Sequence, residues 1–245
     1  MHQSKKMKIA LLGYGKMGKA IEEIALERGH NIVLKINTEN SESLKKDSFT
    51  QVDLAIDFST PSTAKQNIEL ALHAKTPIIS GTTGWLNDLE EIEKLCISEN
   101  SAFLYASNFS LGVNLFFELN KNLAQLMSKH SQYNIELDEV HHIQKLDAPS
   151  GTAITLAEQI ISSDNERTNW VLNEATKPQE LTINTLRKDA VPGTHTVTYE
   201  SEIDSISIKH EAHSRKGFAL GAVIAAEWIL NKKGVFTMRD VLFSD

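Results

Sequence analysis

Residues 8–29, KIALLGYGKMGKAIEEIALERG, join two periodicities around a glycine turn. The first residues are continuously apolar over a stretch too short for a helix, and they predict a buried parallel strand at 7–12. Apolar residues then recur at helical spacing from Lys16 to Arg28, and Gly29 follows as a stop signal. This order of strand, glycine turn and helix predicts the first unit of a parallel α/β sheet.

The glycines of GYGKMG lie between that strand and that helix. Gly13 permits a tight turn, Gly15 lets the backbone approach a pyrophosphate, and Gly18 lets the helix pack on the strand. The N–H groups of the turn and the helix dipole favour a negative charge there. Because strand and helix both flank the loop, the pattern predicts dinucleotide binding rather than a glycine turn without a ligand.

The residues after the second strand leave the choice between NADPH and NADH open. The acidic residue expected about 20 residues after the loop, which would hold a ribose 2′-hydroxyl, is absent. Lys35 or Lys16 could pair with a 2′-phosphate, whereas Glu39 could reach a 2′-hydroxyl only if its loop curls back. The pattern favours NADPH, or use of both cofactors, unless Lys35 is merely a solvated charge at a strand end.

Short apolar strands continue to alternate with helices as far as residue 106. This alternation predicts a doubly wound parallel sheet with right-handed crossovers. Hydroxyl-rich loops at 57–61, 80–84 and 107–112 follow three of the strands, where the carboxyl ends of parallel strands line a ligand crevice. The alternative for these loops is ordinary turn and helix-capping chemistry. The predicted strands are 31–36, 53–58, 76–80 and 102–106, and the predicted helices are 62–74 and 86–99.

The pattern changes after a predicted helix at 112–129. Four successive segments alternate in polarity along their length, which is typical of an antiparallel sheet. The segment 217–230 then returns to a buried-helix composition. We therefore expect a Rossmann-like domain from 1–110 and 215–245, interrupted at 111–214 by an inserted α+β domain on a mostly antiparallel sheet. The alternating segments are 133–142, 181–187, 194–201 and 205–213, and the stretch around 164–180 resembles a linker.

Composition and charge exclude several functional classes. The 245 residues are 41% hydrophobic and 23% charged, which predicts one large or two small globular domains. The 25 basic and 32 acidic residues give a net charge of −7, which disfavours nucleic acid as a partner. No apolar run is long enough to span a membrane, and the N-terminus does not read as a secretory signal. The single cysteine, Cys96, is expected to be a buried hydrophobe in a cytoplasmic protein.

The stretch 139–158, EVHHIQKLDAPSGTAITLAE, contains most of the reactive side chains of the second domain. His141 and His142 point to opposite faces of a strand, so only one of them is expected to face a given cleft. Lys145 follows in a loop, and a helix then begins whose N–H groups could bind an anion. Histidine, lysine and helix N-terminus together predict a site that binds carboxylates and donates protons. The residues that open this helix are Ser150, Gly151 and Thr152.

Other kinds of site fit this stretch less well. Zinc needs three or four convergent ligands, and neither the His141–His142 pair nor the His210–His213 pair has the i, i+4 helical spacing, so we expect no metal. A serine hydrolase would need G-x-S-x-G, which APSGT is not. A purely structural role, with a capped helix and two core histidines, stays open.

Several motifs together resemble one enzyme family. EVHHIQKLDAPSGTA closely resembles the E-x-HH-x-x-K-x-DAPSGTA signature of the 4-hydroxy-tetrahydrodipicolinate reductases, also called dihydrodipicolinate reductases. GYGKMG resembles their cofactor loop, GTTG at 81–84 their nicotinamide loop, and NFSLGVN at 108–114 their interdomain segment. GTHTV and the HSR at 213–215 resemble their late motifs, while RKDAVPG at 187–193 departs from the more usual R-x-G-D-x-x-G.

The resemblance implies an activity. It is the NADPH- or NADH-dependent reduction of 4-hydroxy-tetrahydrodipicolinate to tetrahydrodipicolinate in diaminopimelate and lysine biosynthesis, by a homotetramer built through the second-domain sheets. The alternatives are a nucleotide-sensing module and a two-domain dehydrogenase that acts on an amino acid or a sugar.

The resemblance also implies roles for individual residues. His141 is the implied proton donor and Lys145 its catalytic partner. The implied ligands of the dicarboxylate substrate are His142, Gly151, Thr152 and Arg215. The residues expected to bind the cofactor are Gly13, Tyr14, Gly15, Lys16, Met17, Gly18, Lys35, Gly81, Thr82, Thr83, Ser107, Asn108 and Phe109.

Overall fold

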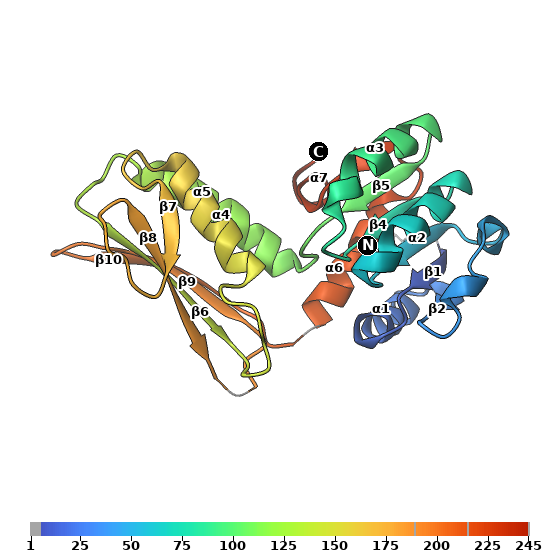
Figure 1. The fold of residues 1–245 in the computed structure, drawn as a ribbon, viewed down its shortest axis with the longest axis horizontal. Helices are drawn as coiled ribbons and strands as arrows, with labels where there is room; N and C mark the ends of the chain where they lie inside the picture. Colours follow the sequence, from blue (N-terminus) through green and yellow to red (C-terminus); the bar gives the residue numbers. More distant parts are fainter. Residues whose placement is uncertain (1–5, 189, 215, 245) are drawn as a thin grey trace. The chain divides into compact units, whose positions relative to one another are not determined.

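The computed structural model describes residues 6–188, 190–214 and 216–244. Its contacts divide the chain into two compact units, drawn together in Figure 1. The first unit comprises 1–111 and 216–245, and the second comprises 112–215. The second unit is therefore an insertion into the first.

The first unit is built on a parallel sheet of six strands, in the order β11-β5-β4-β3-β1-β2. The chain leaves β1 toward β2 on one side and returns to β3 on the other, so the strand order reverses between β1 and β3. Ligands of such sheets bind at the carboxyl ends of the strands where this reversal occurs. The strands are β1 (Lys8–Leu12), β2 (Asn31–Ile36), β3 (Leu54–Asp57), β4 (Ile78–Ser80), β5 (Ala102–Tyr105) and β11 (Gly234–Phe236).

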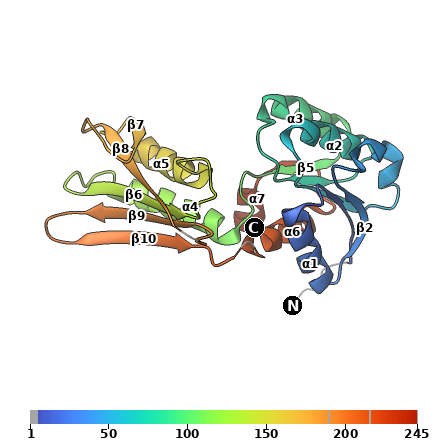
Figure 2. The same cartoon turned by 60° about the horizontal axis from the view of Figure 1, so that its bottom comes forward.

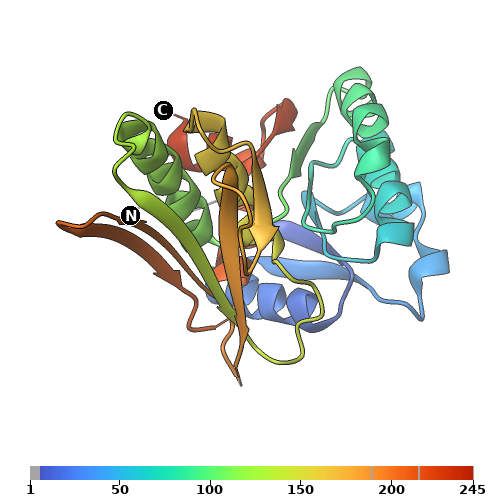
Figure 3. The same cartoon turned by 60° about the vertical axis from the view of Figure 1, so that its left-hand side comes forward.

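Helices cover both faces of this sheet, as Figures 2 and 3 show. In β1, Ile9 and Leu11 pack in one core with α1, α6 and α7, while Ala10 and Leu12 pack in a second core with α2 and α3. Burial on both faces is the reason why the strands are continuously apolar rather than alternating. The predicted doubly wound fold is confirmed. The helices are α1 (Lys16–Glu27), α2 (Pro61–His73), α3 (Leu89–Ser98), α6 (Lys216–Ile229) and α7 (Met238–Phe243), with short 3-10 helices at Ser41–Ser43, Lys46–Phe49 and Leu86–Asp88.

The second unit is built on a mixed sheet of five strands, in the order β10-β9-β6-β8-β7. The predicted antiparallel pairing holds for β10–β9 and β9–β6, but β6–β8 and β8–β7 are parallel. The expectation of a mostly antiparallel sheet is therefore wrong for half of the pairs. The strands are β6 (Asn134–His141), β7 (Asn169–Leu172), β8 (Glu180–Arg187), β9 (Thr194–Glu200) and β10 (Ser205–Glu211).

The physical reason is that the helix α5 (Gly151–Ser163) carries the chain back before β7, and residues 173–179 carry it back again before β8, so that both strands run in the direction of β6. The strand β7 lies inside 164–180, which resembled a linker; its four residues are exposed or half-buried.

Two helices cover one face of this second sheet. The helix α4 (Leu111–Met127) lies beside α5, and both pack on side chains of β6, β8 and β9. Asn120 of α4 donates from Nδ2 to the Leu156 carbonyl of α5 at 3.1 Å and to the Gln159 Oε1 at 2.9 Å. Leu137 of β6 belongs to this core. Because side chains alternate along a strand, Glu139 and His141 face the same side of the sheet as Leu137.

Two expectations from the sequence concern the burial of Cys96 and the presence of membrane-spanning helices. Cys96 of α3 is fully buried, as predicted. Among the helices of the described residues, none combines the length and the hydropathy needed to cross a bilayer.

The helix α6 offers a test of packing in the first unit. Gly221→Ala should destabilise it by about 1–3 kcal/mol or more, because the new Cβ would lie 1.7 Å from the Phe109 carbonyl oxygen. Gly217→Ala in the same helix is the control, since its Cβ would meet nothing closer than the Ser110 Oγ at 3.6 Å. We expect the control to be neutral or to stabilise by up to about 1 kcal/mol in urea unfolding. Equal effects of the two changes would contradict this account.

Candidate active site

In the glycine loop of the first unit, close backbone contacts leave no room for a side chain at Gly13 and Gly18, whereas the space around Gly15 is open. Gly13 has φ +98°, and a Cβ there would lie 2.0 Å from the Phe58 carbonyl oxygen. A Cβ on Gly18 would lie 2.5 Å from the Gly13 carbonyl oxygen, whereas one on Gly15 would meet nothing within 4 Å. No side chain caps α1 at Gly15. The loop therefore presents a helix N-terminus and an uncovered backbone, which suits a phosphate.

A cavity of about 490 Å³ opens beside this loop, at the carboxyl ends of β1, β2 and β3. This size is in the range of small-molecule sites. Of the residues predicted to bind the cofactor, Gly13, Tyr14 and Gly15 line it, and the others do not. The remaining lining residues, most of which the sequence analysis did not single out, are Ile36, Asn37, Thr38, Ser41, Phe58, Ser59, Thr60, Ser62, Thr63 and Asn67.

Lys35, one of the predicted cofactor ligands, is engaged by a neighbouring carboxylate. Its Nζ lies 2.6 Å from Oε1 of Glu22 and 4.7 Å from the centre of the Tyr14 ring, and the Tyr14 hydroxyl donates to Glu22. The hydrogen bond with Glu22 raises the pKa of Lys35 and lowers the pKa of Glu22. A 2′-phosphate would have to compete with Glu22 for this ammonium group, so the role of Lys35 stays a prediction.

A buried carboxylate, Asp57, ties the loops after β3 and β4 together. Its Oδ1 accepts from Ser59 Oγ at 2.7 Å and Asn67 Nδ2 at 3.1 Å, and its Oδ2 accepts from Ser80 Oγ at 2.9 Å and Thr82 Oγ1 at 2.7 Å. Burial raises the pKa of Asp57, against these four hydrogen bonds, which lower it. The hydroxyl of Thr82 also accepts from the Ser59 N–H at 2.8 Å, so it holds the two loops in register.

The remaining predicted cofactor residues differ in their surroundings. Phe109 is buried in the core and packs on Phe58 at 5.5 Å between ring centres. A Cβ on Gly81 would lie 2.4 Å from the Phe58 ring. Asn108 Oδ1 accepts from the Ser110 N–H at 2.8 Å. Lys16, Thr83 and Ser107 are exposed, and Met17 packs against the core.

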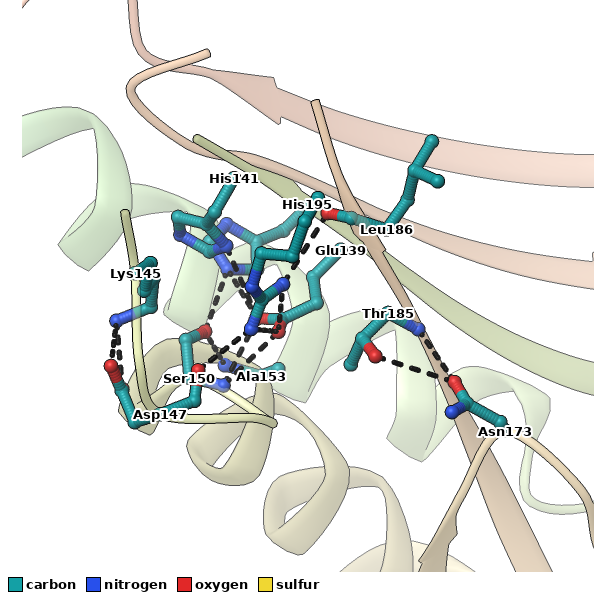
Figure 4. A network of polar contacts seen from close by, with 11 residues as sticks. Glu139, His141, Lys145, Asp147, Ser150, Ala153, Asn173, Thr185, Leu186 and His195 are labelled. Carbon is teal, nitrogen blue, oxygen red and sulfur yellow. Dashed lines mark hydrogen bonds and ion pairs between the residues drawn. The ribbon is translucent and has the colours of Figure 1, made fainter. Parts of the chain in front are cut away.

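In the second unit, four side chains from three adjacent strands meet on the face that also carries α5 (Figure 4). Glu139 and His141 are two residues apart in β6 and therefore share a face. The register places His195 of β9 opposite Glu139, and Arg187 of β8 opposite His141. Glu139, His141 and His195 are all buried.

The Glu139 carboxylate is the centre of this cluster. Its Oε2 lies 3.4 Å from His141 Nδ1 and 3.7 Å from His195 Nε2. Its Oε1 lies 3.3 Å from both terminal nitrogens of Arg187. Both oxygens accept from the Ser150 N–H, at 3.1 and 3.2 Å. A fully buried anion is thus compensated by a guanidinium group, two imidazole rings and a backbone amide.

Ser150 and Arg187 connect this cluster to the loop before α5. Ser150 is the N-cap of α5: its Oγ accepts from the Ala153 N–H at 3.2 Å and lies 3.1 Å from His195 Nε2. Arg187 donates to the Asp147 carbonyl at 2.6 Å. The loop that contains Lys145 is therefore held against the cluster at both ends.

The surroundings of Glu139 and His141 lower the pKa of both side chains. Burial alone would raise the pKa of Glu139, but contacts with His195 and Ser150 and the charge of His141 lower it to about 2. Burial lowers the pKa of His141 to about 4, although Glu139 opposes this shift. At neutral pH the unliganded protein therefore carries an ionised Glu139 beside an uncharged His141.

Lys145 and three of the four predicted substrate ligands, all but Arg215, lie in the part of the chain that directly follows His141. Lys145 Nζ pairs with both carboxylate oxygens of Asp147, at 2.8 and 2.7 Å. His142 is half-buried and follows His141 at the end of β6, and Gly151 and Thr152 form the first turn of α5. Arg215 lies outside the described residues. The structure thus brings His141, Lys145 and the start of α5 together.

Three members of the cluster had no role predicted from the sequence: Glu139, Arg187 and His195. The two-residue spacing of Glu139 and His141 on a strand was a usable signal for the first. No local signal indicated the other two, because strand register brings them in from residues 46 or more positions away.

Glu139, His141 and His195 also have the composition of a metal site, with one candidate ligand atom each within 4.8 Å of one another. The Arg187 guanidinium group and the Ser150 amide already occupy the carboxylate oxygens, and a guanidinium group at 3.3 Å opposes a cation there. Glu139, His141 and His195 therefore form a hydrogen-bonding cluster in which the charge of the carboxylate is already compensated. The expectation that no metal binds stays a prediction.

Comparisons with known proteins agree over both units. The family model described as dihydrodipicolinate reductase, N-terminus, matches residues 7–109, and the one described as dihydrodipicolinate reductase, C-terminus, matches residues 112–242. The second match contains the whole Glu139 cluster.

Curated proteins and solved structures show the same similarity. A 4-hydroxy-tetrahydrodipicolinate reductase of Christiangramia forsetii is 53% identical over 236 residues, covering 96% of this chain and 98% of that protein. The reductase of the same name from Zymomonas mobilis is 38% identical and covers 99% of both chains. The structure of dipicolinate-bound dihydrodipicolinate reductase from Paenisporosarcina has a TM-score of 0.78 at 22% identity, covering 97% of this chain and 100% of that one.

The Asp57 network generates a prediction about the first unit. Asp57→Asn should cost on the order of 2 kcal/mol in urea unfolding and weaken NADPH binding, because an amide nitrogen would face hydroxyl groups that now donate to a carboxylate. Asp53→Asn, exposed and just before the same strand, keeps its acceptor for the Lys8 N–H and should leave both properties unchanged. Unaltered binding and stability in Asp57→Asn would contradict the role given to this network.

Proposed function

The chain belongs to the dihydrodipicolinate reductase family, and we propose that it reduces 4-hydroxy-tetrahydrodipicolinate to tetrahydrodipicolinate with NADPH or NADH. The reaction is a step of diaminopimelate and lysine biosynthesis. The observation that carries this proposal is the similarity to the Christiangramia forsetii reductase over nearly the full length of both chains. The dipicolinate bound to the Paenisporosarcina enzyme is a dicarboxylate, the class of substrate that the proposal requires.

In this proposal the first unit holds the dinucleotide. The backbone of Gly13 and Gly15 and the start of α1 would meet the pyrophosphate, since no Cβ or capping side chain covers them. The cavity at the ends of β1, β2 and β3 would take the adenosine side of the cofactor. Gly81, Thr82 and Thr83 would approach the nicotinamide side, with Asp57 holding their loop in place.

The second unit would hold the substrate. Its two carboxylates would be bound by His142, by Lys145 and by the backbone of Gly151 and Thr152 at the N-terminus of α5. Arg215 is a further proposed ligand. Lys145 and Arg215 would supply positive charge to a dianionic substrate, with the substrate taking the place of the Asp147 carboxylate on Lys145.

The balance of the reaction defines the task of His141. The 4-hydroxyl group and one ring hydrogen leave as water, and one hydride, which bound NADPH or NADH supplies, and one proton add to the ring. His141 would deliver the proton, because it lies beside Lys145 and the start of α5, and the negative charge of a bound dianionic substrate would oppose the lowering of its pKa by burial. A cytoplasmic homotetramer remains part of the proposal, and sedimentation of the full chain tests the oligomeric state.

The proposed activity can be measured by the loss of absorbance of the reduced nicotinamide. The unstable substrate would be generated in place from pyruvate and aspartate semialdehyde by a coupling synthase, with NADPH and NADH compared at equal concentration. We expect turnover that pyridine-2,6-dicarboxylate inhibits. Dinucleotide binding without turnover would instead favour the nucleotide-sensing module or a different dehydrogenase.

Removal of either proposed catalytic side chain should slow this reaction strongly. His141→Ala and Lys145→Ala should each reduce the rate by on the order of 10²- to 10⁴-fold, the range of a positioned acid or electrostatic contact. Lys188→Ala, a nearby change of the same kind outside the site, is the control. Wild-type turnover in either site variant would rule out the role assigned to that residue.

The carboxylate of Asp147 is paired with the ammonium group of Lys145, which the proposed substrate needs. Asp147→Asn should therefore bind pyridine-2,6-dicarboxylate more tightly than the wild type, by up to about tenfold, since Lys145 no longer has to exchange one carboxylate for another. Titration calorimetry at neutral pH measures the change. Glu166→Gln, an exposed acidic residue outside the site, controls for the general loss of negative charge. Weaker binding in Asp147→Asn would show that the pair supports the site instead.

A further inference from the structure

The two ring nitrogens of His141 have different surroundings. Nδ1 is buried and has no hydrogen-bond partner among the described residues, and the carboxylate of Glu139 lies 3.4 Å from it. Nε2 points the other way, toward Gly193 in the loop before β9. The protein therefore distinguishes an inner and an outer nitrogen on this ring.

The outer nitrogen is uncovered because residue 193 has no side chain. A Cβ on Gly193 would lie 3.0 Å from Nε2 and 3.3 Å from Cδ2 of the His141 ring. These distances are closer than ordinary van der Waals contact, so any side chain at this position would press on the ring and cover Nε2. Among the two nitrogens, only Nε2 is thus placed to exchange a proton with a small molecule.

The inner carboxylate is held in place from three elements. The Ser150 amide at the start of α5, Arg187 of β8 and His195 of β9 all face Glu139. Lys145 is the further charged group near the His141 ring. A carboxylate with its oxygens fixed in this way remains an acceptor and cannot rotate away from Nδ1.

We propose that Glu139 is the positioning residue of His141: its carboxylate accepts a hydrogen from Nδ1, so that Nε2 is the nitrogen that gives the proton to the substrate, and Gly193 keeps Nε2 open. This inference rests on the proposed function for the final proton transfer. The assignment of the two nitrogens does not, because it concerns the unliganded protein.

The proton balance of the site follows from this arrangement. In the unliganded protein the ring carries one hydrogen, on Nδ1, and the lone pair of Nε2 takes a second proton from solvent when a dianionic substrate brings negative charge beside it. That second proton leaves from Nε2 to the substrate, and the ring returns to its starting form. Glu139 remains ionised throughout and does not transfer a proton itself.

The first test is the tautomer of the His141 ring in the unliganded protein at neutral pH. ¹⁵N chemical shifts of histidine-labelled protein, assigned by comparison with His141→Gln, should show the hydrogen on Nδ1. In Glu139→Gln the amide group should face Nδ1 as a donor, and the hydrogen should move to Nε2. A wild-type ring protonated on Nε2, or the same tautomer in both proteins, would overturn the proposal.

Kinetics of the same variants test the functional part. Glu139→Gln should lower kcat on the order of 10²-fold while KM changes less than about threefold, because the acid is misplaced but the substrate ligands remain. The fall in rate on the alkaline side of the pH profile should shift to lower pH, since removal of the anion makes the protonated ring less stable. A lower kcat with an unshifted pH profile would indicate a merely structural role and would count against the proposal.

Two further variants keep the test decisive. Glu136→Gln makes the same change on an exposed residue of β6 and should leave kcat, the pH profile and the tautomer unchanged.

Gly193→Ala retains Glu139 and should keep the hydrogen on Nδ1 of His141 but lower kcat at least tenfold. Full activity of this variant would overturn the assignment of Nε2. If the wild-type tautomer is as expected but no variant or wild-type protein turns over, the reaction has failed and the assignment of the nitrogens stands.

Discussion

The compensation of one buried charge, the carboxylate of Glu139, is the constraint on which the second unit depends. An ionised group taken out of water must be met by cations and hydrogen-bond donors, and here they come from β8, β9 and the start of α5. Only one register of the three strands places Arg187 and His195 beside it. The same requirement fixes the N-terminus of α5 and the loop that contains Lys145, so the electrostatics of a single residue organise the candidate site.

The first unit uses a second buried carboxylate in a different way. Asp57 is surrounded by hydroxyl and amide donors rather than by a cation, and burial raises its pKa, whereas the pKa of Glu139 is lowered. Neutral donors from several segments bind this one carboxylate without creating a positively charged site. This suits a structural role at the edge of the sheet where the pyrophosphate is proposed to bind. Contacts with His195 and Ser150 leave the Glu139 carboxylate ionised next to His141, which suits the proposed proton transfer. The two units therefore use buried carboxylates in two ways, one for a structural task and one for the reactive task proposed for His141.

Much of the fold and part of the site followed from local sequence patterns. The glycine loop, the alternating strands and helices of the first unit, and the pairing of His141 and Lys145 with a helix N-terminus are all contained in short segments with a defined period. The parallel pairs β6–β8 and β8–β7 were missed, since a single alternating strand reads alike in either orientation. Most of the predicted cofactor residues lie outside the cavity beside the glycine loop, because a motif locates a loop but not the direction of each side chain within it.

The sequence by itself determined which segments are candidates for chemistry: a glycine turn at Gly13, Gly15 and Gly18 between a strand and a helix, and a histidine followed by a lysine and a helix start. Those are properties of neighbouring residues, where backbone geometry and spacing leave few alternatives. Only the tertiary structure decided that Glu139 lies inside the site, that Arg187 and His195 surround it, and that His141 turns Nδ1 inward and Nε2 toward Gly193. These relations join residues of three strands, and they depend on register and on the burial of charge, which arise when the strands pack together.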